Sequence, residues 1–543
     1  MQLSKISAAG RRGSALLLLP AMLVAGAAVP GVGGVAASPA RLTSHAGTTL
    51  TWGVQALPRT LFVPTDYSSL ASWVMVLIQG QMLAFGPQQQ LQPAILSSWK
   101  QVSPTKFVYT LRPGVKFSDG NPVTATDIAY TLGLQLDPKV AAQEAALFSS
   151  VKSVTATGPS TVTMVLTHPD SLVQYLPASI VGYVYEKKSV ETNLQNYGTP
   201  QVLPVGAGPY MVQQYVPDSQ ITLVRNPYYY GAKPKWDTII FKGIPDAQTM
   251  LLALRSGEIE GTFSVQPSIA SQYASFSHVQ SYPSDAWNGL TLDMKEAPFS
   301  DLNVRKALAY ATDAAGIEQA VVRGYGKVAV TLNDPSIYSA SLPAATVSKL
   351  YSTQVTNLPF NLDKAKAALA ASSVPHGFST TLNVPVDSEY DTLAAQILKN
   401  DWAKIGVTLN LRLMPGGPRF QIILNHKKNL GVQIIGNAPD APDPHELPWE
   451  YFNCDQAVFN GNNSSNYCNP RVDALLKQSV TATPPAKAAT LTIQAAALAS
   501  QAVPVINLGW NDFLVAVKNG WSFRNLNAFT PGNIGWLDDL NSQ

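Results

Sequence analysis

Residues 205–261 read VGAGPYMVQQYVPDSQITLVRNPYYYGAKPKWDTIIFKGIPDAQTMLLALRSGEIEG, a succession of turn, strand and helix signals. Two runs rich in aromatic and β-branched residues within 210–224 predict a β-hairpin, and residues 239–241 predict a further strand. Asp246 is a typical helix-capping residue, and the apolar run after it ends at Gly257, the residue type favoured just beyond a helix. The segment therefore predicts strands followed directly by an amphipathic helix.

The composition narrows the class of protein. The chain has 543 residues, which is more than a single hydrophobic core usually supports, so we expect several domains. Of its 37 basic residues, Lys5, Arg11 and Arg12 lie within residues 1–37, a segment without acids. The rest of the chain therefore has 37 − 3 = 34 basic and 34 acidic residues, a net charge of zero. This neutrality argues against a nucleic-acid partner.

Residues 1–37 have the order of features of a secretion signal. Positive residues come first, an apolar run follows at 15–28, and the small residues 35–37 suit a cleavage site. A membrane anchor is the alternative, although prolines and glycines in the run disfavour a spanning helix. We expect an exported protein, in the periplasm or at the outer face of the cell membrane. It is not expected to be lipid-anchored through a cysteine, because none lies near the cleavage region.

The chain has two cysteines, Cys454 and Cys468. An even number of cysteines in an exported protein predicts a disulfide. A metal site is the alternative, and it is disfavoured because no pair of histidines accompanies the two thiols.

Three segments together resemble a known family. They are residues 205–261, residues 106–132 (KFVYTLRPGVKFSDGNPVTATDIAYTL) and residues 287–313 (WNGLTLDMKEAPFSDLNVRKALAYATD). Within the second segment, Thr124 and Asp127 have the spacing of a helix capping box. Together the segments resemble the extracellular solute-binding proteins of family 5, the peptide- and nickel-binding receptors of ABC importers.

The resemblance implies an α/β fold of the two-lobed periplasmic-binding-protein type. It implies the type II, large-cluster form with an extra domain and with two crossover strands at the hinge. On this template, lobe 1 (domain I) comprises residues 38–65, 205–286 and 509–543. The inserted small domain (domain II) comprises residues 66–204, and lobe 2 (domain III) comprises residues 287–508.

The resemblance also implies a ligand-binding loop after a strand that ends at Gly436. In the peptide-binding members an aspartate of this loop meets the terminal ammonium group of the ligand, and Asp440 is in register with it. A charge-assisted hydrogen bond of this kind would anchor one end of a peptide. The alternative is that Asp440 bonds its own turn. We expect Asn437, Pro439 and Ala441 to contribute to the same site.

Further residues are candidates for the cleft wall. Trp287 and Trp510 lie at the predicted crossovers, where aromatic rings would give a large contact area, and ordinary core packing is the alternative. Leu57 and Pro58 follow a predicted strand at 49–53, which borders the cleft in the family and can pair with an extended ligand.

Three arginines are candidate partners for a ligand carboxylate: Arg59, Arg412 and Arg419. The sequence does not select one of them.

Metal and catalytic sites have weaker support. Asp440, Asp443, His445 and Glu446 contain hard-metal ligands, but intervening prolines restrict their convergence and no known spacing is met. The chain lacks GxSxG, HExxH, a phosphate loop, and GxGxxG between a strand and a helix. We expect no catalytic residue, no metal and no cofactor.

These observations predict an extracytoplasmic solute-binding protein of an ABC importer. It would capture oligopeptides or dipeptides between hinged lobes and deliver them, as a monomer, to permease subunits at the membrane. A nickel chelate, a sugar or another small solute is the alternative ligand. A secreted hydrolase is the alternative from a different class of protein.

Overall fold

The computed structural model describes residues 48–66, 69–87, 89–140, 142–143, 145–386, 388–425, 430–459, 461–529, 532–533 and 535–542. The predicted secretion signal at residues 1–37 lies outside these ranges. No helix within them is both long enough and apolar enough to cross a lipid bilayer.

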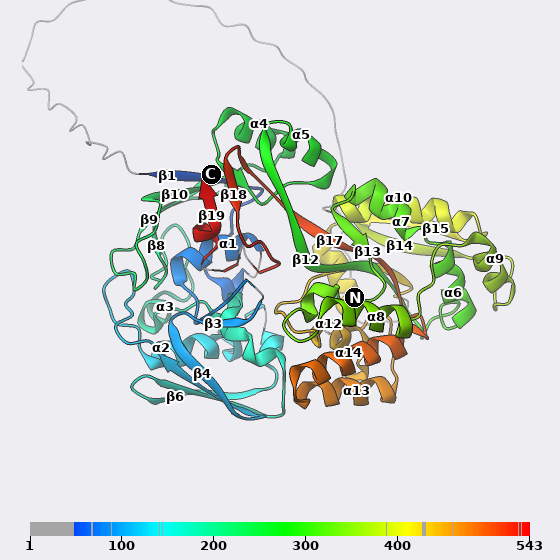
Figure 1. Cartoon of the computed structure of the whole chain (residues 1–543), viewed down its shortest axis with the longest axis horizontal. Helices are drawn as coiled ribbons and strands as arrows, with labels where there is room; N and C mark the ends of the chain where they lie inside the picture. The colour runs from blue at the N-terminus through cyan, green and yellow to red at the C-terminus, as the bar shows by residue number, and fades with distance from the viewer. Residues whose placement is uncertain are drawn as a thin grey trace, which may run out of the picture. The chain divides into compact units, whose positions relative to one another are not determined.

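The largest sheet in the described chain has 11 strands, and its two longest strands, β12 and β17, lie side by side (Figure 1). The strand order is β15-β14-β16-β12-β17-β11-β1-β10-β9-β8, and β13 pairs with β17 off this path. The strand bounds are β1 Thr49–Val54, β8 Tyr210–Val216, β9 Gln220–Arg225, β10 Thr238–Gly243, β11 Gly261–Thr262, β12 Ser277–Leu292, β13 Gly326–Val328, β14 Ser379–Pro385, β15 Thr408–Met414, β16 Val432–Asn437 and β17 Val505–Lys518.

β12 and β17 are the predicted crossover strands, and they pair with each other antiparallel along most of their lengths. On one side β12 pairs with β16, and the sheet continues to β14 and β15. On the other side β17 pairs with β11, and the sheet continues through β1 to β8. The two strands therefore connect the two halves of the sheet. The domain boundaries drawn from the sequence stay a prediction.

The pairing of β12 with β17 contains a bulge. Pro283 pairs with Asp512, whereas Ala286 pairs with the next residue of β17, Asn511. Two residues of β12, 284–285, therefore have no counterpart on β17, and the second of them has a left-handed φ of 55°. Bulges of this kind bend a strand and interrupt its ladder of hydrogen bonds.

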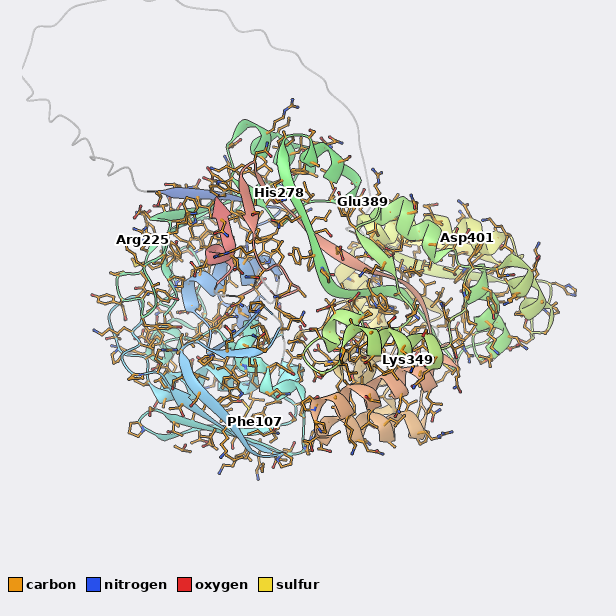
Figure 2. All side chains as sticks on the ribbon, viewed as in Figure 1. Phe107, Arg225, His278, Lys349, Glu389 and Asp401 are labelled. Carbon is orange, nitrogen blue, oxygen red and sulfur yellow. A yellow bond between two sulfur atoms is a disulfide. The ribbon has the colours of Figure 1, made fainter. Side chains whose placement is uncertain are left out.

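Three smaller sheets complete the strands of the described chain. Their strand orders are β4-β5-β7-β6, β2-β3 and β18-β19. The bounds are β2 Leu83–Phe85, β3 Leu91–Pro93, β4 Leu96–Ser103, β5 Lys106–Leu111, β6 Val151–Gly158, β7 Thr161–Leu166, β18 Trp521–Phe523 and β19 Leu540–Ser542. Phe107 (labelled in Figure 2), Tyr109 and Leu111 alternate along β5 and are buried, so one face of this strand lies against the core.

Helices occupy many of the connections between the strands (Figure 1). Their bounds are α1 Ser69–Gln79, α2 Ala125–Gly133, α3 Lys187–Asn193, α4 Ala247–Ser256, α5 Ala270–Ala274, α6 Leu302–Ala311, α7 Ala314–Ile317, α8 Ala344–Gln354, α9 Leu362–Ala370, α10 Glu389–Ala403, α11 Gly416–Leu424, α12 Glu446–Phe452, α13 Pro470–Thr481, α14 Pro485–Ser500 and α15 Trp536–Asp539.

The predicted helix caps are confirmed. At α2, the N–H of Asp127 donates to Thr124 Oγ1 at 3.3 Å, and the N–H of Thr124 donates to Asp127 Oδ2 at 2.9 Å. At α4, Asp246 Oδ1 accepts from the N–H of Thr249 at 2.7 Å, and Gly257 ends the helix with a φ of 77°. Each such cap stabilises its helix by about 1 kcal/mol.

The apolar side chains form several separate clusters. One contains Trp52 of β1, a second contains Trp402 of α10, and a third contains Tyr109 of the four-stranded sheet. A fourth, which contains Ile493 of α14, packs α14 against β12 and β17. The two crossover strands are thus held in place by helices of the segment between them.

Cys454 and Cys468 form the predicted disulfide. The bond joins the segment just after α12 to the residue two positions before α13. It fixes the loop between these helices.

Candidate ligand-binding site

A cavity of about 750 Å³ lies against the middle of β12 and β17. From β12 it is lined by every second residue: Tyr282, Ser284, Ala286 and Asn288. Because successive side chains of a strand point to opposite faces, this spacing places a single face of β12 on the cavity. Residues 511–514 of β17 complete this surface.

The walls of the cavity come from segments on both sides of the crossover strands. Residues 263–267 follow β11 on one side, and residues 438–440 follow β16 on the other. The other wall residues are Gln55, Ser72, Trp73, Phe85, Ala178, Ser179, Ile180, Tyr183, Val321, Val322, Glu389, Tyr390, Ala528, Phe529 and Gly532. The cavity therefore lies between the two halves of the large sheet, where a two-lobed binding protein holds its ligand.

Aromatic rings supply much of the lining. Three pairs of neighbouring rings, with centroid separations of 5.0, 5.0 and 5.9 Å, are Trp73–Phe263, Phe85–Phe529 and Tyr282–Phe513. Such rings offer a large contact area and lose little conformational entropy when a ligand binds. The cavity is therefore suited to a solute with substantial apolar surface.

Asp440 lies in the lining, in the loop of residues 438–445 that connects β16 to α12. Hydrogen bonds to the carboxyl group of Glu446, the first residue of α12, fix the shape of this loop. Glu446 accepts from the N–H of Asp440 at 2.7 Å through Oε1 and from the N–H of Ala441 at 3.3 Å through Oε2. The loop backbone is thus held by a neighbouring side chain while Asp440 itself lies half-buried at the cavity.

Further carboxyl groups surround this loop. Burial raises the pKa of Glu446 well above its ordinary value, and the charges of Asp440 and Glu450 raise it further. Glu450 Oε2 accepts from Asn437 Nδ2 at 2.8 Å. This concentration of acids favours a cation at the cavity end of the loop, because an opposite charge would relieve their mutual repulsion.

The other predicted residues of this loop have different surroundings. Pro439 lines the cavity, as Asp440 does. Asn437 directs its amide to Glu450, and Ala441 is fully buried behind the loop.

The two tryptophans proposed for the cleft wall are absent from the lining. Trp287 is fully buried, and its Nε1–H donates to Asn507 Oδ1 at 2.9 Å. Trp510 Nε1–H donates to the carbonyl oxygens of Thr331 and Leu332, both at 3.1 Å. Both rings belong to the cluster that packs α14 against the crossover strands, so core packing, the alternative weighed for them, describes their place.

Leu57 and Pro58 are also absent from the lining, although their neighbour Gln55 contributes to it. Leu57 packs at the edge of the cluster around β1, and the carbonyl of Pro58 accepts a hydrogen bond from the hydroxyl of Tyr215. These contacts fix the turn after β1.

None of the three candidate arginines lines the cavity. Arg59 and Arg412 are exposed elsewhere, and Arg419 is buried in α11, where its Nη1 donates to the carbonyl oxygen of Ile434 at 2.5 Å.

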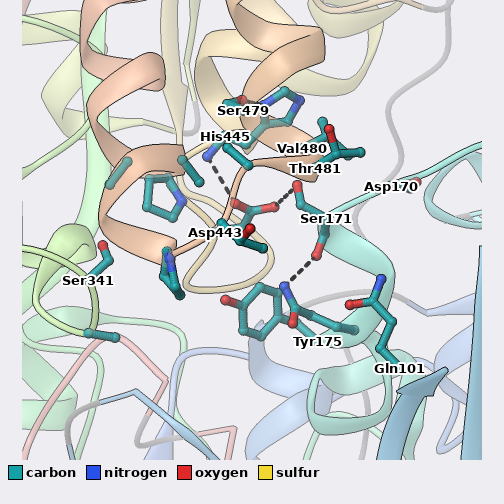
Figure 3. A pocket seen from close by; sticks show the side chains of 18 of the residues that line it. Gln101, Asp170, Ser171, Tyr175, Ser341, Asp443, His445, Ser479, Val480 and Thr481 are labelled. Carbon is teal, nitrogen blue, oxygen red and sulfur yellow. Dashed lines mark hydrogen bonds between the residues drawn. The ribbon is translucent and has the colours of Figure 1, made fainter. Parts of the chain in front are cut away.

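A second cavity, of about 670 Å³, lies beyond the same loop (Figure 3). Here Asp443 is buried and accepts from Ser171 Oγ at 2.6 Å, and His445 Nδ1 lies 2.8 Å from Ser479 Oγ. Burial raises the pKa of Asp443 and lowers the pKa of His445 to about 4. These two members of the sequence cluster therefore face Ser171 and Ser479, whereas Asp440 lies at the larger cavity.

Sequence reasoning missed most of the lining. The lining residues at 178–180, 263–267 and 528–529 belong to segments far apart in the chain, and no local pattern brings them together. The aromatic residues Phe263 and Phe529 were the available signal, because large rings in loop segments are uncommon unless they are buried or bind something.

The chain belongs to the bacterial extracellular solute-binding proteins, family 5. The family description for the middle part of these proteins matches residues 90–459. Members of this family bind solutes and are not enzymes, and they act in the periplasm or outside the cell.

Two curated relatives show the range of the family. The chain is 28% identical over 396 residues to a probable di/tripeptide-binding protein 5 of Pseudomonas aeruginosa, covering 68% of this chain and 72% of the relative. It is 26% identical over 450 residues to heme-binding protein A of Haemophilus influenzae, covering 77% of this chain and 78% of the relative.

A solved structure confirms the fold. The periplasmic binding protein DppA of Helicobacter pylori, in complex with the peptide STSA, matches with a TM-score of 0.76 at 19% identity. The match covers 91% of this chain and 98% of that chain. The fold is that of the type II periplasmic peptide-binding proteins, as the sequence predicts.

Proposed function

We propose that the chain captures a peptide in the 750 Å³ cavity and delivers it to the permease of an ABC importer. The observation that carries this proposal is the place of Asp440 in the lining, since a carboxylate there can hold the α-ammonium group of a peptide by a charge-assisted hydrogen bond. A relative named as a di/tripeptide-binding protein supports this class of solute. We further propose that the protein acts as an exported monomer.

Side-chain amides in the lining suit the backbone of a peptide. They are Gln55, Gln266, Asn288 and Asn511. Each amide both donates and accepts hydrogen bonds, as peptide groups do. Asn511 Oδ1 is buried and accepts no hydrogen bond from any described residue.

The position of the cavity supports closure of the two halves of the protein around the ligand. A peptide held by residues 438–440 and by residues 263–267 contacts both halves of the large sheet at once. A ligand stabilises a closed arrangement only by the contacts that the open arrangement lacks. Contacts to both halves meet that requirement.

Isothermal titration of the exported chain with tripeptides and tetrapeptides tests the proposal. We expect binding by the wild type and a loss of roughly tenfold to hundredfold in Asp440→Asn, because a hydrogen bond to a charged group is worth about 1.5–3 kcal/mol. N-acetylation of the peptide removes the ammonium group and should cost the wild type a similar factor. In Asp440→Asn the acetylated and free peptides should bind alike.

Asp512→Asn is the matched control. Asp512 also lines the cavity, where its Oδ2 accepts from Ser281 Oγ at 2.5 Å, but it belongs to β17 and is not the residue assigned to the ammonium group, so the same chemical change there should have a smaller effect. Equal affinity of wild type and Asp440→Asn for free peptides, or undiminished binding of acetylated peptides, contradicts the assigned role.

A planar aromatic solute is the second candidate, favoured by the three ring pairs and by the relative named as heme-binding. Titration with heme, with a nickel chelate and with sugars separates these ligands from peptides. Cleavage of a labelled peptide during the incubation would instead favour a secreted hydrolase.

A further inference from the structure

The charged side chains that line the 750 Å³ cavity are all acidic. They are Glu389, Asp440 and Asp512, and no lysine or arginine occurs among the described lining residues. They come from three separate elements: the start of α10 (Glu389 is labelled in Figure 2), the loop after β16, and β17.

The cation closest in sequence to the lining is Arg323, and it is bonded to the backbone of Ser268, whose hydroxyl donates to the lining residue Glu389 at 3.2 Å. Arg323 follows the lining residue Val322, but its Nη1 donates to the carbonyl oxygen of Ser268 at 2.8 Å, and its side chain is exposed. Arg323 is not itself a lining residue. It lies next to the cavity segment rather than inside the cavity.

The N-terminus of α10 is the other feature that could attract an anion, since helix N-termini carry partial positive charge. Its first turn already contains two acids, Glu389 and Asp391, and the N–H of Asp391 is capped by Ser388 Oγ at 3.2 Å. The two carboxylates offset the helix dipole at the point where α10 meets the cavity.

A carboxylate seated in this cavity would therefore lose water without gaining a cationic partner. It would also be repelled by the lining acids at short range, where the low dielectric of a closed site strengthens the repulsion. A cation gains attraction from the same acids and from the faces of the aromatic rings.

We infer that the part of the solute held in the cavity carries net positive charge and no free carboxylate. This inference rests on the proposed peptide-binding function and specifies its solute class. The protein then binds peptides whose carboxyl end is blocked or extends beyond the cavity, in preference to short peptides that carry both termini inside it.

The test is isothermal titration of the wild-type chain with the dipeptide Phe-Leu and with its carboxyl-terminal amide, Phe-Leu-NH2. A dipeptide is short enough that its carboxyl group must enter the cavity with its ammonium group. We expect the amide to bind roughly tenfold to hundredfold more tightly, which is the usual effect of leaving a buried polar group without a partner.

A preference for the amide below roughly tenfold, or a preference for the free acid, overturns the inference and leaves peptide capture standing. Failure of the amide as well as the free acid to bind also overturns the inference, and peptide capture itself is refuted only when the tripeptides and tetrapeptides fail to bind too. As a second measurement, Asp512→Asn should narrow the preference for the amide, because one repelling charge is removed. An unchanged or widened preference in that variant counts against the electrostatic origin of the effect.

Discussion

Glu318 is a buried carboxyl group with too few hydrogen-bond partners for its charged form. It begins the π-helical turn Glu318–Val322 and is 7% exposed. The hydroxyl of Tyr390 donates to its Oε1 at 3.1 Å, and no described residue bonds its Oε2. Burial raises the pKa of Glu318 from its ordinary 4.5 to about 7, and the Tyr390 bond opposes this rise only in part.

The raised pKa makes the stability of the protein depend on pH. Between pH 4.5 and about 7 the folded state keeps a proton that the unfolded state has lost, so the free energy of unfolding falls as pH rises. The contribution is fully present below the unfolded pKa and is lost once pH passes the folded pKa. The gap corresponds to roughly 3 kcal/mol, at about 1.4 kcal/mol for each pH unit.

Glu318→Gln removes this dependence, because glutamine keeps an oxygen for Tyr390 and cannot ionise. Relative to the wild type, the variant should gain roughly 2–3 kcal/mol in unfolding free energy between pH 5 and pH 8. Urea unfolding at four or five pH values measures the difference. Other buried acids, such as Asp285 with its pKa of about 6, are present in the wild type and in the variant. Their contributions to the pH dependence therefore cancel in the difference between the two unfolding free energies.

Glu389→Gln is the control, since it makes the same chemical change at an exposed site. The unfolding free energy of this control, relative to the wild type, should show no comparable rise between pH 5 and pH 8. A constant difference between Glu318→Gln and the wild type from pH 5 to pH 8, or a variant less stable than the wild type at pH 8, would refute the reasoning.

Two further predictions concern individual bonds between side chains. The double substitution Cys454→Ser/Cys468→Ser should lower the free energy of unfolding by about 3 kcal/mol, since the disulfide closes a loop of 14 residues. Wild-type protein kept in reductant should match the variant, and equal stability with and without reductant contradicts the expectation. Ser171→Ala should lower the melting temperature at pH 7, because it removes a donor from the buried Asp443 at a cost of roughly 1–3 kcal/mol. Ser103→Ala, exposed at the same cavity, is the control, and an equal effect of the two substitutions speaks against the bond.

Features that depend on neighbouring residues were predictable from the sequence. The caps at Thr124 and Asp246 use bonds to groups three residues away, so the sequence contains both partners. The strands β8 and β9 follow from runs of aromatic and β-branched residues between turn signals. The family resemblance supplied what no local pattern could, namely the two crossover strands, which the structure shows as β12 and β17, and the hypothesis for Asp440.

The sequence did not predict which face of a strand lies on the cavity and which face packs against helices. The alternation along β12 places Trp287 opposite Ala286 and Asn288, but it does not say which set faces a cavity and which faces helices. Large aromatic residues suit both environments. The contact of Phe85 with Phe529 joins residues from opposite ends of the chain, and only the folded arrangement reveals it.

The bulge in β12 restricts which insertions and deletions this strand can accept. Because two residues are inserted rather than one, the strand leaves the bulge with the same side facing the cavity as it had on entry. A single-residue deletion there would move each later side chain of the strand to the opposite face of the sheet. Asn288 would then point toward the helices, and the ring of Trp287 would enter the space that a ligand needs. Length variation at this point in the strand is therefore compatible with binding only in steps of two.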